Sequence, residues 1–281
     1  MPDAYDLELL KPSDEPPPQP MRAERPVWLW LVIAALMLAT AGAVYLFVQR
    51  RQWTAPVDRR PAPAAAAVQP LGSNALAIDV PPLDQSDAVV RELVRQLSSH
   101  PRILAWLATD GLIRTATVAV ENVSGGATPA GHFPVLKPTA GFETITRGRE
   151  LYISPRSYER YDALADAMAS IDPAGAARLY TTLKPRVEEA YRDLGYPDTP
   201  FDRALERAIV LLLRVPATDA RVEPKGIGYG YADPALEGLT GAQKQLLRMG
   251  PRNIRIIQSS LRQIALALGI PAERLPPAPA T

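Results

Sequence analysis

The stretch TGAQKQLLRMGPRNIRIIQSSLRQIALAL, residues 240–268, decides the fold class of this chain. Thr240 followed three residues later by Gln243 is the pattern of a capping box, so a helix is expected to begin there. That helix should end before the Gly-Pro pair at 250–251, because neither residue continues a helix smoothly. Apolar residues then recur at three- and four-residue intervals over 252–268, which predicts a second helix. Two helices joined by a short turn indicate a mainly helical domain.

Similar start signals occur upstream of this stretch. Ser, Asp or Thr precedes proline at 154–155, 172–173 and 199–200, and each pair suits the N-cap and first turn of a helix. Apolar periodicity predicts further helices at about 86–97, 101–107 and 112–123. Asp110 is expected to cap the helix at 112–123, although that segment is rich in β-branched residues. Pro185 lies inside the helix that starts at 172–173 and is expected to kink or split it.

Two segments have the character of strands. Residues 142–146 and 150–154, separated by Arg-Gly-Arg, predict one small β-hairpin. The stretch KGIGYGYADP, from Lys225, resembles a phosphate loop, but its lysine precedes the glycines and its glycine spacing does not match G-x-G-x-x-G. We interpret it as an extended segment with Ile227, Tyr229 and Tyr231 on one side. Its glycines would then allow another backbone to approach closely.

Residues 27–48, VWLWLVIAALMLATAGAVYLFV, form an uncharged run without proline. At about 1.5 Å per residue this run is long enough to cross a bilayer core, and Trp and Tyr lie near its ends. The sequence therefore predicts a single transmembrane helix. Around it we expect a disordered tail at 1–26, a Pro/Ala-rich linker at 49–82, a helical domain at 83–270 and a disordered tail at 271–281.

Composition excludes several kinds of site. The 281 residues include no cysteine and two histidines, which removes disulfides, Cys-ligated metals and His-rich metal centres. Neither G-x-S-x-G nor H-E-x-x-H occurs. We therefore predict no catalytic, cofactor-binding or metal-binding residues. A carboxylate site assembled from distant segments stays open.

The strongest candidate surface is basic. Between Glu237 and Glu273 there is no acidic residue, whereas five basic residues occur. Together with the two tyrosines of the extended segment they form the predicted interaction surface: Lys244, Arg248, Arg252, Arg255, Arg262, Tyr229 and Tyr231. Such an excess of positive charge can attract an anionic partner. The other interpretation is a solvated helix face whose arginines pair with acids from elsewhere in the fold.

The chain resembles an uncharacterised bacterial domain-of-unknown-function family over about residues 81–270. The resemblance rests above all on YADPALEGLTGAQKQLLRMGPRNIRIIQ, and also on SSHPRILAWLATDGLIRTATVAVENV and RLYTTLKPRVEEAYRDLGYPD. It implies one N-terminal span, a Pro/Ala-rich linker, a helical domain and a place in the bacterial inner membrane. It implies no catalytic residues.

These observations predict a mainly α protein: a single-pass membrane anchor, a multi-helix domain and a small hairpin. The expected function is non-enzymatic, as a cell-envelope interaction protein with a protein or anionic envelope partner. An envelope hydrolase is one alternative, and a membrane-tethered nucleic-acid binder is another if the domain is cytoplasmic. Arginines after the span slightly favour a cytoplasmic C-terminal side, whereas the anchor–linker–domain layout is typical of periplasmic proteins. We expect the periplasmic orientation.

Overall fold

The computed structural model describes residues 70–72, 75–131, 138 and 140–277. The chain divides into two units, and every described residue belongs to the second, Gln69–Thr281. The predicted transmembrane helix at 27–48 and the tail at 1–26 lie outside the described residues. Among the residues described, no single helix has the length and apolar character needed to span a membrane. Two consecutive helices reach that length and composition only when they are taken together, and there is a bend of 112° between them.

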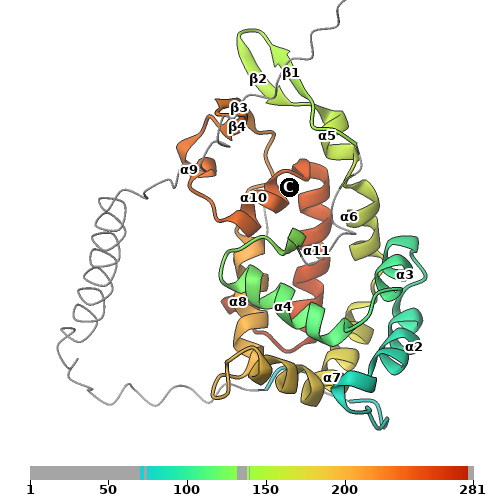
Figure 1. The fold of residues 1–281 in the computed structure, drawn as a ribbon. Helices are drawn as coiled ribbons and strands as arrows, with labels where there is room; N and C mark the ends of the chain where they lie inside the picture. Colours follow the sequence, from blue (N-terminus) through green and yellow to red (C-terminus); the bar gives the residue numbers. More distant parts are fainter. Residues whose placement is uncertain (1–69, 73–74, 132–137, 139, 278–281) are drawn as a thin grey trace, which may run out of the picture. The chain divides into compact units, whose positions relative to one another are not determined.

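The described unit is mainly helical, as predicted (Figure 1). Its α-helices are α2 (Asp87–Leu97), α3 (Pro101–Leu107), α4 (Leu112–Ser124), α5 (Pro155–Glu159), α6 (Asp162–Ala169), α7 (Pro173–Asp193), α8 (Phe201–Leu213), α9 (Pro234–Glu237), α10 (Gly241–Leu247) and α11 (Gly250–Ala267). Short 3₁₀ turns are η1 (Leu83–Gln85), η2 (Pro129–Gly131) and η4 (Ala272–Arg274). The bent pair that together has the composition of a span is α3 with α4.

Helix termini follow the sequence in part. The capping box of α10 is present, with Thr240 and Gln243 bonding each other's backbone amides. The predicted cap of α4 is wrong: Gly111 occupies the N-cap, and the carboxylate of Asp87 accepts hydrogen bonds from the amides of Gly111 and Leu112. A side chain from α2 thus accepts the hydrogen bonds at the start of α4 that Asp110 was expected to accept.

A proline and a glycine lie at notable positions in two other helices, α7 and α11. Pro185 does not split α7, which runs unbroken over its 21 residues. Gly250 begins α11 with φ of +82°, and a Cβ placed there would lie 2.4 Å from the ring of Tyr158. Only glycine therefore fits where α11 approaches α5.

The sheet is larger than predicted. The expected hairpin is present as β1 (Thr144–Arg147) and β2 (Glu150–Ile153), but two more strands, β3 (Arg221–Lys225) and β4 (Gly228–Tyr231), extend it to an antiparallel sheet in the order β1-β2-β3-β4. Pro224 and the exposed side chains of β3 conceal its strand character in the sequence. Ile227 lies in the turn between β3 and β4 and is fully exposed, so of the three predicted residues only Tyr229 and Tyr231 belong to the strand.

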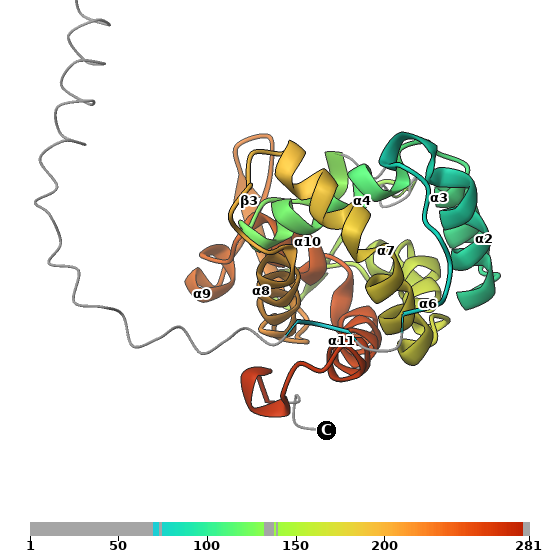
Figure 2. The same ribbon diagram turned by 90° about the horizontal axis from the view of Figure 1, so that it is seen from below.

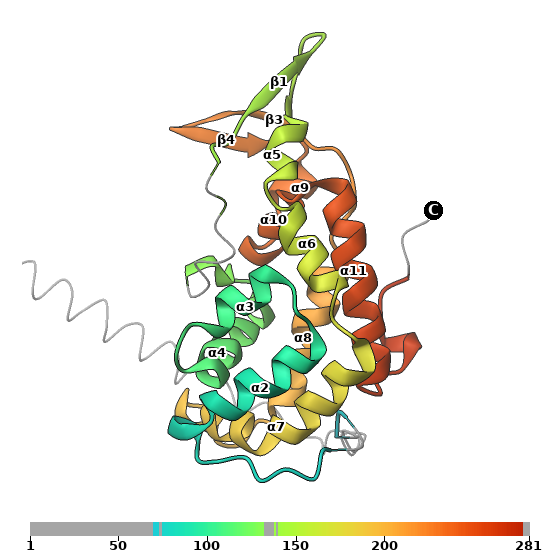
Figure 3. The ribbon, with the colours of Figure 1, turned by 90° about the vertical axis from the view of Figure 1, so that its right-hand side faces the viewer.

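Helix α11 is the centre of the packing. It contacts α6, α7 and α8 along its length, and α4 packs across α7 and α8 (Figures 2 and 3). Figure 3 shows the sheet at one end of the unit and α2, α4 and α7 toward the other. Two buried amides on α11 fix it in place: Asn253 donates to Asp162 and to the carbonyl of Tyr158, and Gln258 donates to the carbonyls that end α8.

The packed domain extends beyond the predicted bounds of 83–270 at both ends. Leu71 and Leu275 are both buried, and the amide of Gly72 donates to the carbonyl of Leu268. The described part of 70–82 therefore belongs to the domain and not to a spacer. Leu275, which follows η4, lies in the same buried cluster as Leu71, where the sequence predicted a disordered tail. Isolated apolar residues among prolines and alanines carry too weak a pattern to show this.

Candidate functional site

The five basic residues of the predicted surface do not form one free face. Arg252 lies 3.4 Å from Asp162 and 3.5 Å from Asp166, both on α6. Arg262 donates to the carbonyl of Pro276. These two side chains are engaged within the fold, which is the arrangement expected of a solvated helix face.

The remaining three basic residues differ from one another. Lys244 lies 3.2 Å from the carboxylate of Glu237. Arg248 and Arg255 are exposed, and neither pairs with a carboxylate among the residues that the structure describes. Arg248 lies beside the sheet, whereas Arg255 lies further along α11.

Four of the predicted residues do meet. Tyr229, Tyr231, Lys244 and Arg248 line a cavity of about 100 Å³ between β4 and α10, together with Glu237 of α9. We call this cavity the tyrosine pocket. Phe142 completes its rim, with its ring centroid 5.5 Å from that of Tyr229. Sequence spacing could not reveal Phe142 or Glu237 as members, because they come from separate segments.

Glu237 organises the charges of the tyrosine pocket. Its carboxylate lies 2.7 Å from the Nζ of Lys225 and 3.2 Å from that of Lys244, and it accepts a hydrogen bond from the amide of Tyr231. The hydrogen bond from Lys225, then that from Tyr231 and that from Lys244, lower the pKa of Glu237 to about 2. The carboxylate is thus ionised and neutralised at neutral pH.

The hydroxyl of Tyr231 is unusual within this pocket. The residue is only 6% exposed, and its hydroxyl makes no hydrogen bond of ordinary geometry to any residue that the structure describes, although the guanidinium of Arg248 lies beside it. Burial raises the pKa of Tyr231 to about 12, although the nearby guanidinium of Arg248 acts in the opposite direction. The hydroxyl therefore keeps its proton at neutral pH and is available as a donor.

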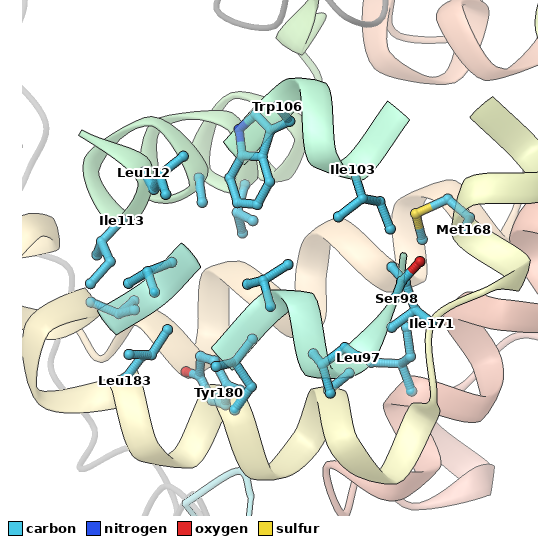
Figure 4. A pocket seen from close by; sticks show the side chains of 18 of the residues that line it. Leu97, Ser98, Ile103, Trp106, Leu112, Ile113, Met168, Ile171, Tyr180 and Leu183 are labelled. Atoms are coloured by element: carbon cyan, nitrogen blue, oxygen red, sulfur yellow. The ribbon is translucent and has the colours of Figure 1, made fainter. Parts of the chain in front are cut away.

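A much larger cavity lies at the other end of the unit. It has a volume of about 420 Å³ and lies among α2, α3, α4, α6, α7 and α8. We call it the apolar cavity. In Figure 4, Ile103 and Trp106 approach it from one side, and Leu97, Tyr180 and Leu183 approach it from the opposite side.

Two hydroxyl groups in the wall of the apolar cavity donate hydrogen bonds to groups of the protein. Thr117 donates to the carbonyl of Ile113, and Tyr180 donates to the buried carboxylate of Asp202. Burial, followed by this hydrogen bond, raises the pKa of Tyr180. The cavity therefore presents hydrocarbon and offers water few hydrogen-bond partners.

Almost all of the lining of the apolar cavity is hydrocarbon, and a few polar groups lie at or near its border, among them Ser98 and Arg102 of the lining. The hydroxyls of Ser98 and Ser170 lie 2.7 Å apart, and the amide of Arg102 donates to the Nδ1 of His100. Arg102 is the one charged residue among those that line the cavity. Its guanidinium pairs with no carboxylate within the described part of the chain. A half-buried cation at the border of a hydrocarbon-lined space is suited to the head of an anionic amphiphile.

The apolar cavity was missed by sequence reasoning. Each of its helices shows an ordinary amphipathic pattern. No signal in the periodicity separates a residue that fills a core from one that lines a space, because the difference depends on how the helices cross. No group of three or more His, Asp or Glu suited to a metal ion occurs in the ranges described.

Comparison with family models gives a match over residues 112–265, to the family described as "Protein of unknown function (DUF3014)". The matched region runs from the first residue of α4 into α11 and includes the whole sheet. It contains the tyrosine pocket completely and the apolar cavity in part, since α2 and α3 precede it. No curated protein and no solved structure matches the chain.

Proposed function

The chain belongs to the DUF3014 family of unknown function, and from the geometry of its helical domain we propose that it is a non-enzymatic binding protein for a single-chain anionic amphiphile, such as a fatty acid. The hydrocarbon chain would occupy the apolar cavity, and the anionic head would meet Arg102. The observation that carries the proposal is a largely apolar cavity of about 420 Å³ that has one cation in its lining, Arg102, which pairs with no carboxylate among the described residues.

The size and chemistry of the apolar cavity support this ligand. Binding pockets for small ligands span roughly 300–1,000 Å³ and combine an apolar lining with a few polar groups that set orientation. The cavity has this composition, with Ile103, Leu183 and Met168 among its apolar walls. An empty space of this kind costs stability, because its lining lacks van der Waals partners. A hydrocarbon chain would restore those contacts.

The predicted membrane anchor also favours a lipid-type ligand. A transmembrane helix at 27–48 would hold the domain close to a source of acyl chains. We include in the proposal that the protein is a single-pass bacterial inner-membrane protein with this domain in the periplasm. A fusion of alkaline phosphatase to the C-terminus tests the orientation, because the enzyme is active only on the periplasmic side.

The binding proposal is tested with the full chain in lipid nanodiscs, with empty nanodiscs as the blank. Palmitate is expected to displace a fluorescent fatty acid from the wild-type protein. Ala167→Phe, which fills the apolar cavity from α6, should abolish displacement without lowering thermal stability. Ala235→Phe places the same ring on an exposed position of α9 and should bind like the wild type.

The head-group contact is tested separately. Arg102→Gln should weaken palmitate binding roughly tenfold, the effect of losing a hydrogen bond to a charged group, but leave cetyl alcohol unaffected. Arg95→Gln, on the exposed face of α2, is the matched control. Unchanged palmitate binding by a folded Ala167→Phe protein contradicts the proposal. If that variant does not fold, Ile103→Trp fills the same cavity from α3 and serves in its place.

A further inference from the structure

The tyrosine pocket is a second built site, separate from the apolar cavity. The two share no lining residue, and the pocket lies where β4, α9 and α10 meet (Figure 1). Its most informative feature is the buried hydroxyl of Tyr231, which lines the pocket and finds no acceptor for its proton among the residues that the structure describes. A buried donor without an acceptor is unfavourable, so a group that accepts its hydrogen bond would be stabilised there.

The charges of the pocket define that group. Glu237 is neutralised by Lys225 and Lys244, so those three side chains already compensate one another in part. Arg248 also lines the pocket, and it pairs with no carboxylate in the part of the chain that the structure describes; its guanidinium lies close enough to Tyr231 to affect the hydroxyl. One unpaired guanidinium and one free hydroxyl donor together suit a planar monoanion.

We propose that the tyrosine pocket binds a single carboxylate group, with the guanidinium of Arg248 and the hydroxyl of Tyr231 as its donors. A volume of about 100 Å³ accommodates a carboxylate and the carbon atoms next to it, and excludes a larger head group. The rings of Phe142 and Tyr229 flank the entrance and would contact those carbon atoms. A doubly charged phosphate would find too little positive charge for its second negative charge.

Two further features preserve the shape of the pocket. Gly230 lacks a Cβ, and one placed there would lie 2.8 Å from the side chain of Lys225. Glycine at this position therefore lets Lys225 cross β4 to reach Glu237. The capping box of α10 begins the helix that carries Lys244, and Arg248 is the C-cap residue of that helix, so the backbone positions of both residues are set by α10.

The test is an NMR titration of the full chain in nanodiscs with N-acetylalanine, whose amide is the neutral comparison. The acid, and not the amide, is expected to shift signals of residues around Tyr231. Arg248→Gln should weaken binding roughly ten- to a hundredfold, and Tyr231→Phe by several-fold. Arg255→Gln removes an exposed arginine elsewhere on α11 and should leave the affinity unchanged.

Three further arms of the titration separate the possible sources of the carboxylate and the possible anions. N-acetyl-trialanine presents a peptide C-terminus, and N-acetyl-Ala-Glu-Ala-amide presents an acidic side chain; the tighter of the two identifies the source. Inorganic phosphate should compete poorly. Equal competition by phosphate, or unchanged affinity in Arg248→Gln, overturns the proposal. The Ala167→Phe protein should bind N-acetylalanine like the wild type. A failure of the apolar cavity to bind palmitate would therefore be distinguishable from a failure of the tyrosine pocket to bind a carboxylate.

Discussion

Glu237 shows how one residue links two strands and two helices. Its carboxylate holds Lys225 at the end of β3, the amide of Tyr231 in β4 and Lys244 in α10. Nothing in the local sequence marks it, since it is the last residue of the four-residue helix α9. Its role follows from the three partners that the fold brings to it.

The depressed pKa of Glu237 predicts a specific acid response. The folded pKa is about 2 and the ordinary value is 4.5, so the carboxylate stabilises the fold above pH 4.5, and the stabilisation is lost as the pH falls toward 2. The free energy of unfolding should therefore decrease less between pH 4.5 and about pH 2 in the Glu237→Gln protein than in the wild type. Urea unfolding at a series of pH values measures it, and equal pH dependence in both proteins would contradict the assignment.

Buried polar contacts fix how the helices lie relative to one another, which the apolar periodicity of each helix does not determine. Asp202 at the start of α8 is 3% exposed and accepts hydrogen bonds from the amide of Leu71, from Tyr180 and from Lys184. It therefore joins the N-terminal segment and α7 to α8. Asp87 joins α2 to the start of α4 in the same way.

Removing the Asp202 carboxylate tests how much this buried contact contributes to stability. Asp202→Ala leaves Lys184, whose side chain is 22% exposed, without its partner 2.5 Å away. We expect a loss of about 3 kcal/mol in the free energy of unfolding, the cost of breaking a buried ion pair. Asp84→Ala removes an exposed carboxylate from Arg114 and should cost under about 1 kcal/mol. Similar losses in the two variants would show that burial does not decide the effect.

At the scale of the whole unit, the helices enclose a space instead of filling it. Helices α2, α3 and α4 face α7 and α8 across the apolar cavity, while a well-filled core lies between α11 and the sheet. The cavity lies where the packing is incomplete, so its occupant would contribute to the stability of the unit.

Ligand binding should therefore appear in thermal unfolding. Palmitate at one hundred times its Kd should stabilise the folded state by about 2.7 kcal/mol. The Tm of the wild type should rise with palmitate concentration, while the Tm of Ala167→Phe should not change. Calorimetry of the full chain in nanodiscs makes the measurement. A rise of the same size in both proteins would place palmitate outside the apolar cavity.

Much of the helical unit could be predicted from sequence, because its signals are local. The Thr240–Gln243 capping box, the proline-led helix starts and the periodicity of α4 each depend on neighbours within a few residues. The β1–β2 hairpin was predicted for the same reason. Strand β3 could not be predicted in this way. Its own residues show no clear strand pattern, and it forms because β2 and β4 supply its hydrogen-bond partners.

The sequence by itself determined the helical class, most helix starts and the family. Only the tertiary structure decided which of the basic residues are paired: Arg252 meets Asp162 and Asp166 from 80 or more positions away, while Arg248 meets Tyr231. It also decided that the helices enclose a cavity. The physical reason is the same in both cases, because charge pairing and cavity volume depend on distances between segments, which local spacing does not contain.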